Sequence, residues 1–190
     1  MTHSLRTTAP HKALVLLLAT SMLLAAAGCS DGGTPTTTPP GSPEEIEMQA
    51  VEVPAPDFTL PTLEGGDVTL SSLQGKVVLL NFWQVNCPPC EEEMPWLEAA
   101  AKQYDGQAYV LSVGIGVDAA AARAFVGEGD LQMLVPLDTK GLAAQMYSVG
   151  YTPTTFLIDR AGVVRYVKVG GFARAIDVSA AIGFTLAGGA

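Results

Sequence analysis

The stretch VVLLNFWQVNCPPC, Val77–Cys90, carries the information that decides the fold. Its first half, Val77–Trp83, is a short apolar run rich in β-branched and aromatic residues, which is typical of a strand buried on both faces of a sheet. Its second half ends in two cysteines that enclose two prolines, and a helix-like stretch follows up to residue 104. The sequence therefore predicts a central strand that delivers Cys87 and Cys90 to the start of a helix.

The rest of the chain continues this alternation of strands and helices. Three further apolar runs have the character of strands, at residues 108–115, 133–137 and 154–158. Helix-like stretches separate the strands, at residues 88–104, 119–127 and 141–147. A turn at 159–162 predicts a hairpin between 154–158 and 163–169, and a closing helix is expected over 173–186. We expect an α/β fold whose central mixed β-sheet is flanked by helices.

The N-terminal segment 1–28 is typical of a signal peptide of the lipoprotein type. Basic residues precede a run without charge from Ala13 through Ser30. The run ends in Ala26–Cys29, which resembles the lipobox of bacterial lipoproteins and predicts that Cys29 is lipidated. The alternative is an uncleaved membrane-spanning helix, because the apolar run is just long enough to span.

A flexible tether is expected at residues 29–52, since this segment is rich in Pro, Thr, Gly and Glu and shows no apolar periodicity. It would let a single folded domain, residues 53–190, stand off a membrane to which the lipid on Cys29 anchors it.

Composition limits the possible chemistry. Both histidines lie in the signal segment, so the mature chain offers none to a metal site or to general-base catalysis. All 19 acidic residues lie downstream of Cys29, together with all but two of the ten Lys and Arg residues. This negative charge argues against nucleic acid and anionic lipid headgroups as partners. We expect neither a metal nor a cofactor.

The Cys87-Pro88-Pro89-Cys90 motif is suited to redox chemistry. Proline is tolerated at the first helical positions, so Cys87 is expected at the cap, where free backbone N–H groups and the helix dipole favour its thiolate. Cys90 lies one turn further on and can attack a mixed disulfide formed at Cys87. Two alternatives remain open for such a motif, half of a zinc site and a purely structural disulfide.

Four segments together resemble the TlpA/ResA group of thioredoxin-like proteins, within the redoxin (AhpC/TSA) superfamily. They are Ala55–Leu60, Gly75–Trp83, Cys87–Pro95 and Tyr151–Asp159. The resemblance implies a thioredoxin fold with an N-terminal β-hairpin and an inserted βα unit. It also implies an extracytoplasmic enzyme that reduces disulfides, often those of apocytochrome c or of other exported metalloproteins.

The same resemblance implies roles for individual residues. Cys87 matches the nucleophile, Cys90 the resolving cysteine, and Pro153 a cis-proline that faces them. A cis bond would leave the backbone of Thr152 free to pair with an extended substrate segment. Substrate contacts are also expected from two residues beside the dithiol, Trp83 and Pro88.

This chain departs from the family pattern at two positions. Thioredoxins bury an aspartate where Asn81 stands, and Asn86 replaces the tryptophan that usually precedes the first cysteine. We therefore expect Glu93, three residues after Cys90 on the same helical face, to be the acid–base group for the dithiol. The alternative is that Glu91, Glu92 and Glu93 are only acidic first-turn residues that complement the helix dipole.

The sequence thus predicts a lipid-anchored thiol-disulfide oxidoreductase that reduces exported disulfide-containing proteins and is itself recharged by a membrane-bound thiol donor. Two other functions remain as alternatives. A peroxiredoxin shares the fold, but it needs Thr or Ser where Gln84 stands, three residues before the first cysteine. A copper-delivery or assembly module could bind Cu(I) through two thiolates.

Overall fold

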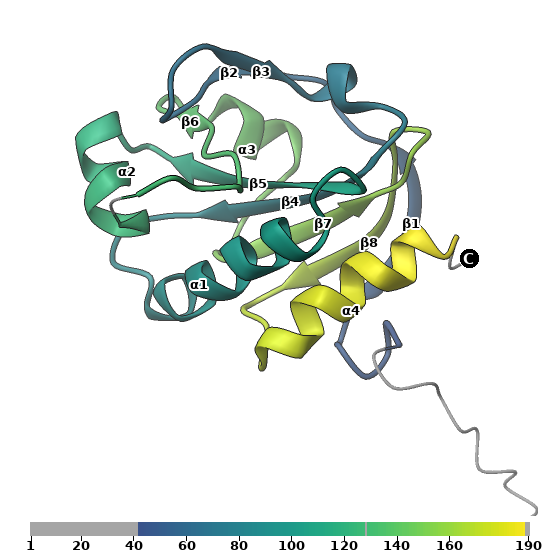
Figure 1. The fold of residues 1–190 in the computed structure, drawn as a ribbon. Coiled ribbons are helices and arrows are strands. Elements are labelled where there is room, and N and C mark those ends of the chain that lie inside the picture. The colour runs from purple at the N-terminus through teal and green to yellow at the C-terminus, as the bar shows by residue number, and fades with distance from the viewer. Residues whose placement is uncertain (1–41, 128, 189–190) are drawn as a thin grey trace, which may run out of the picture. The chain divides into compact units, whose positions relative to one another are not determined.

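A computed structural model describes residues 42–127 and 129–188 as one α/β domain (Figure 1). Its main sheet has six strands in the order β1-β8-β7-β4-β5-β6. The strands of this sheet are β1 (Gln49–Pro54), β4 (Val77–Trp83), β5 (Ala108–Ile115), β6 (Leu137–Asp138), β7 (Thr154–Ile158) and β8 (Val163–Val169). A separate two-stranded hairpin consists of β2 (Thr59–Pro61) and β3 (Asp67–Thr69), followed by a short 3₁₀ turn at Leu70–Leu73. The helices are α1 (Pro88–Gln103), α2 (Ala119–Val126), α3 (Leu142–Met146) and α4 (Ala175–Leu186).

The sheet is mixed, as predicted, and β4 lies near its centre. All seven residues of β4 are buried, because the strand has a neighbour on each side and a packed layer on each face. It runs parallel to β5 and antiparallel to β7, while β5 runs parallel to β6. The hairpin of β7 and β8 extends the sheet to β1.

Two hydrophobic clusters lie on opposite faces of the sheet. One contains apolar residues of α1, α2 and α4, and the other contains residues of α3 and of the β2–β3 hairpin. Figure 1 shows α1 and α4 side by side over one face, with α3 and the hairpin over the other. We call these the α1/α4 face and the α3/hairpin face.

The predicted elements agree closely with the structure except near two edges of the sheet. The run 133–137 forms a strand only at Leu137–Asp138, and two isolated bridges precede it, from Leu134 to Leu111 and from Pro136 to Thr62. Pro136 lies within the run and has no N–H group for a ladder hydrogen bond, which explains the shorter strand.

The predicted domain boundary at Val53 is wrong, because the fold begins earlier. Strand β1 starts at Gln49 and pairs antiparallel with β8. The preceding turn buries the side chains of Ile46 and Met48 against the α1/α4 face. Residues 42–52 therefore belong to the domain and not to the tether.

The signal peptide, Cys29 and the tether up to residue 41 lie outside the described residues. Within the part of the chain that the structure describes, no helix combines the length and the apolar character needed to span a membrane.

Candidate active site

A row of four polar side chains crosses the α1/α4 face of the sheet. Successive strand neighbours contribute Ser112 from β5, Asn81 from β4, Thr155 from β7 and Lys168 from β8, each paired in register with the next. All four residues are buried. They share one face because their strands place alternate residues on opposite sides of the sheet. The row lies beneath the start of α1, where the two cysteines are.

Cys87 and Cys90 form a disulfide at the beginning of α1, with their Cα atoms 5.2 Å apart. Cys87 is the cap residue of the helix, and Pro88 and Pro89 occupy its first two positions, as predicted. Cys87 is 8% exposed, whereas Cys90 has no exposed surface. Only the first cysteine is therefore reachable from solvent.

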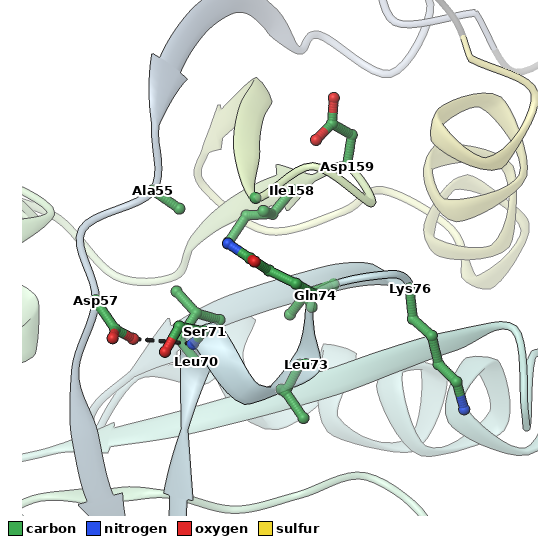
Figure 2. Close-up of a pocket in the computed structure, with 11 residues that line it drawn as sticks. Ala55, Asp57, Leu70, Ser71, Leu73, Gln74, Lys76, Ile158 and Asp159 are labelled. Atoms are coloured by element: carbon green, nitrogen blue, oxygen red, sulfur yellow. Dashed lines mark hydrogen bonds between the residues drawn. The ribbon is translucent and has the colours of Figure 1, made fainter.

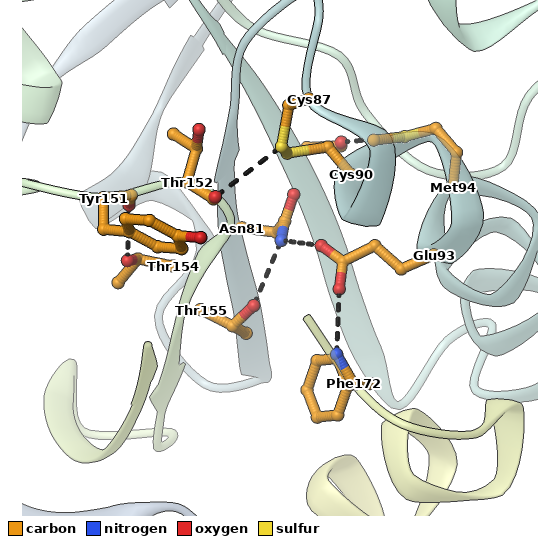
Figure 3. The surroundings of a disulfide bond; sticks show 11 residues. Asn81, Cys87, Cys90, Glu93, Met94, Tyr151, Thr152, Thr154, Thr155 and Phe172 are labelled. Atoms are coloured by element: carbon orange, nitrogen blue, oxygen red, sulfur yellow. Dashed lines mark hydrogen bonds between the residues drawn. A yellow bond between two sulfur atoms is a disulfide. The ribbon is translucent and has the colours of Figure 1, made fainter. Parts of the chain in front are cut away.

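The turn before β7 faces this disulfide (Figure 3). The peptide bond between Thr152 and Pro153 is cis, which confirms the predicted geometry. The carbonyl oxygen of Thr152 lies 3.6 Å from Sγ of Cys87. Thr152 is half-buried and Tyr151 is exposed beside it. Pairing of the Thr152 backbone with substrate stays a prediction.

A groove of about 590 Å³ adjoins the same turn. It is lined by Gln84 on the β4 side and by α3 and the loop that follows it, up to Tyr151 and Thr152. Lys140 brings a positive charge to this groove. An extended substrate segment lying against Thr152 would therefore have open space beside it.

Glu93 lies beneath the dithiol, and it has no exposed surface. Its Oε1 accepts a hydrogen bond of 2.7 Å from Nδ2 of Asn81, and its Oε2 accepts one of 3.2 Å from the backbone N–H of Phe172. A Cβ atom on Gly171 would lie 3.3 Å from Cβ of Pro89 and 3.7 Å from Oε2 of Glu93. The absence of a side chain at Gly171 therefore lets this segment pack closely against the start of α1.

Burial raises the pKa of Glu93 from 4.5 to about 7, although the hydrogen bonds from Phe172 and Asn81 and the charge of Lys168 act in the opposite direction. The carboxyl group can therefore both accept and release a proton near neutral pH. Glu91 and Glu92 are exposed on the same helix, so only Glu93 differs from a solvated first-turn residue.

Asn81 joins Glu93 to the sheet. Its Nδ2 donates both to Glu93 and, over 3.1 Å, to Oγ1 of Thr155. Sequence reasoning set Asn81 aside because an amide does not relay a proton as a carboxyl does. The structure instead places it in direct contact with the candidate acid–base group.

Lys168 was missed from the sequence. Its side chain is buried, and its Nζ lies 3.7 Å from Oε2 of the exposed Glu47 and 5.8 Å from the ring centroid of Phe172. Lysine is rarely buried in this way. In β8 polar and apolar residues alternate, and this pattern does not show which of the polar residues is covered by a helix. Only the register with Thr155 reveals its place in the row.

One predicted substrate contact is wrong. Trp83 has no exposed surface, and its ring stacks on Phe125 of α2 with centroids 4.3 Å apart, so it cannot reach a bound protein. Trp83 is the last residue of β4, a strand whose residues are all buried. Pro88 is exposed beside Cys87 and remains available for such a contact.

A second pocket of about 100 Å³ lies at the opposite end of β4, where Gln74 and Lys76 precede the strand (Figure 2). It lies far along the sheet from the dithiol and contributes nothing to its chemistry. Across the described ranges, no three His, Cys, Asp or Glu side chains gather in a way that could hold a metal ion.

Comparison with known proteins agrees with this geometry. The family model described as "AhpC/TSA family" matches residues 51–167. The chain belongs to this family. Among curated relatives, it is 40% identical to the thioredoxin-like protein YneN of Bacillus subtilis over 119 residues, which cover 61% of this chain and 69% of the relative. It is 38% identical to the thiol-disulfide oxidoreductase ResA of Geobacillus kaustophilus over 122 residues, which cover 64% and 70%.

A solved structure shares the fold of this AhpC/TSA family member. The exposed lipoprotein thioredoxin Etrx1 of Streptococcus pneumoniae superimposes with a TM-score of 0.58 at 26% identity, over 65% of this chain and 95% of the other. Together with the dithiol, these relatives show a thioredoxin-like thiol-disulfide oxidoreductase of the TlpA/ResA type.

Proposed function

We propose that the protein reduces disulfides of exported proteins at the outer face of the cell membrane. The observation that carries this proposal is the buried carboxyl group of Glu93, which ionises near neutral pH beneath a resolving cysteine. Such a group serves the step in which Cys90 must lose a proton, and a structural disulfide would have no use for it.

The reaction consists of two exchanges. In the reduced protein, the Cys87 thiolate attacks one sulfur of the substrate disulfide, a mixed disulfide forms, and the first substrate thiolate leaves. Glu93 then takes the proton of Cys90. The Cys90 thiolate attacks Cys87 in the mixed disulfide, and the second substrate thiolate leaves. The dithiol supplies two electrons, and the two substrate thiolates take up one proton that Glu93 releases and one proton from water. The protein is left with the Cys87–Cys90 disulfide.

The same geometry supports the order of attack. Cys87 caps α1, where the positive end of the helix dipole stabilises its thiolate. Thr152 and the adjoining groove lie on the exposed side of Cys87, where an extended substrate segment would bind. Cys90 is fully buried and can only react with what Cys87 has already captured.

Location and partners form the second part of the proposal. The signal-like segment 1–28 and the lipobox at Cys29 support export and lipid anchoring. Similarity to Etrx1, an exposed lipoprotein, supports the same location. After each cycle a membrane-bound thiol donor would reduce the disulfide again, and apocytochrome c is one class of exported substrate that fits.

Trapping in cells tests the proposal. A full-length Cys90→Ser protein should remain joined to its substrate through Cys87, and reducible adducts can then be identified by mass spectrometry. The matched control is Cys87→Ser with Cys90→Ser, which should capture nothing. Adducts with exported proteins that carry cysteine pairs, together with an acylated N-terminal Cys29, are expected. Adducts formed only with cytosolic proteins would contradict the assigned location. An intact Met1 N-terminus would contradict lipidation at Cys29 and favour an uncleaved signal anchor.

A further inference from the structure

The buried amide of Asn81 has a hydrogen-bonding atom that the structure leaves unused. Its Nδ2 donates to Glu93 and to Thr155, but its Oδ1 has no hydrogen-bond partner among the described residues, although the whole side chain is buried. Buried polar atoms of this kind are rare in proteins and call for an explanation. In Figure 3 this oxygen lies on the side of the amide that faces the disulfide, away from Glu93 and Thr155.

The orientation of this amide is fixed by its neighbours. In its ionised form the carboxylate of Glu93 can only accept hydrogen bonds, so the group 2.7 Å from its Oε1 is then the amino group of Asn81. The oxygen is then left to face the cysteines. The disulfide sulfurs in turn carry no hydrogen and cannot donate to it.

Reduction supplies the missing donor. When the disulfide opens, Cys90 gains an S–H group in a place with no access to solvent. Nearby, the sulfur of Met94 already accepts from Ser112 over 3.4 Å, and the carbonyl oxygen of Thr152 faces Cys87. Among the described residues, Oδ1 of Asn81 is the buried side-chain oxygen that still lacks a hydrogen-bond partner.

We infer that Asn81 accepts a hydrogen bond from the Cys90 thiol in the reduced protein, and that this contact is present in the reduced state alone. Asn81 then bridges Cys90 to Glu93, with its oxygen on the thiol and its amino group on the carboxyl group. The bridge holds Cys90 as a protonated resolving thiol beside the group that will take its proton. It also favours the reduced form of the dithiol over the disulfide.

Infrared spectroscopy of the S–H stretch gives a direct test. The Cys90 band is obtained as the difference between the reduced full-length Cys87→Ser protein and the Cys87→Ser, Cys90→Ser protein. We expect this band below the wavenumber of the thiol in reduced glutathione. Asn81→Leu should move it upward, whereas the control Thr185→Val, at a buried residue of α4 whose hydroxyl donates to Ala181 of the same helix, should leave it in place.

A band at the free-thiol wavenumber in the protein with Asn81 intact would overturn the inference, and this result does not depend on whether the Asn81→Leu protein folds. A band that Asn81→Leu leaves in place would overturn it as well.

Equilibration with glutathione measures the ratio of reduced to oxidised protein. It shows whether Asn81 changes this ratio directly or only through Glu93. Two glutathione molecules supply the two electrons and two protons that reduce the disulfide, and they form one glutathione disulfide. Removing the hydrogen bond should disfavour the reduced protein by about threefold, the value for one weak hydrogen bond. We expect the Asn81→Leu effect to persist when Glu93→Gln is already present. An effect that disappears in that background would show that Asn81 acts only through Glu93.

The inference rests on the dithiol chemistry of the proposed function but not on its direction or location. Both measurements use purified protein and a small thiol, so a failure of the trapping experiment would leave them unaffected. Conversely, if the infrared and glutathione measurements contradict the hydrogen bond, the substrates identified by trapping are not affected.

Discussion

The two faces of the central sheet are built from the same strands, yet they differ in chemistry. On the α3/hairpin face, the rings of Phe82, Phe156 and Tyr147 pack together with centroids 4.9 to 5.9 Å apart. On the α1/α4 face, Asn81 and Thr155 occupy the neighbouring positions of the same strands, and they carry hydrogen bonds to Glu93 and to each other. Both faces bury apolar side chains, and the α1/α4 face also holds the polar row beneath the dithiol.

This difference teaches how a small domain accommodates a buried acid. Polar groups without partners would destabilise the core, so the row on the α1/α4 face is tolerable only where hydrogen bonds satisfy it. The aromatic cluster lies on the opposite face, at the next residue along β4 and β7. Its close packing offsets the cost of burying the polar row. Stability and reactivity are therefore expected to respond to different substitutions, and the following predictions test that separation.

The largest effect is expected from truncating the aromatic face. Phe82→Ala should lower the free energy of unfolding by about 3–5 kcal/mol, because it leaves a cavity in a fully buried cluster. The pH dependence of thiol alkylation in the folded protein should not change. Denaturant unfolding measures the first quantity and iodoacetamide labelling the second, and a shifted thiol titration would show that the two faces are coupled.

Glu93→Gln should change how the stability of the protein depends on pH. The pKa of Glu93 is about 7 in the folded protein and 4.5 in the unfolded chain, so the folded state binds the proton more tightly. Its contribution to stability is complete below pH 4.5 and is lost as the pH rises to about 7, a difference of roughly 3 kcal/mol. Urea unfolding at pH 4.5 and pH 8 should show that this loss disappears in Glu93→Gln.

The same variant should slow resolution of the mixed disulfide, on the order of 10²-fold for loss of an acid–base group. It should also lower the pKa of the cysteines, because the ionised carboxylate opposes thiolate formation. Glu92→Gln, on the exposed side of α1, is the matched control and should change neither property. A response to Glu92→Gln in place of Glu93→Gln would mean that the wrong carboxyl group has been assigned.

Alkylation of the reduced protein should distinguish the two cysteines. Cys87 is at the helix cap and partly exposed, whereas Cys90 is fully buried, so Cys87 should be modified at least about tenfold faster and with the lower apparent pKa. Peptide mapping after brief labelling across the pH range measures this ratio. Preferential labelling of Cys90 would reverse the assigned roles.

The smallest effect is expected from Lys168→Met. The charge of Lys168 lowers the pKa of Glu93, so its removal should move that pKa above about 7. A rise of one unit would reduce the ionised fraction at pH 7 from about one half to about one tenth. Carbon NMR of the Glu93 carboxyl group measures the shift. Lys102→Met removes a charge from the exposed side of α1, where Lys102 pairs with Glu98, and should leave the Glu93 titration unchanged.

Much of the fold and part of the candidate site could be predicted from the sequence, because their signals are local. The apolar runs of β4, β5, β7 and β8 gave their bounds, and the two prolines after Cys87 placed it at a helix cap. The resemblance carried by the Tyr151–Asp159 segment identified the cis-proline. These features depend on neighbours in the chain and on recognised motifs.

The missed features depend on register between distant segments. Nothing near Lys168 in the sequence shows that it lies beside Thr155, or that Thr155 lies beside Asn81. The first four residues of β1, 49–52, were assigned to the tether, since nearly all residues of this strand are exposed and it contains Glu and Pro, so it has no buried apolar face to mark it. Its pairing with β8 only becomes apparent in three dimensions.

The two borders of the central sheet have a consequence for behaviour at high concentration. At one border β6 has only two residues and follows Pro136, and at the other β1 ends in Glu52, Val53 and Pro54, with a register irregularity before them. Short strands, proline, charge and bulges all hinder the addition of a foreign strand. Copies at high concentration should therefore resist edge-to-edge aggregation.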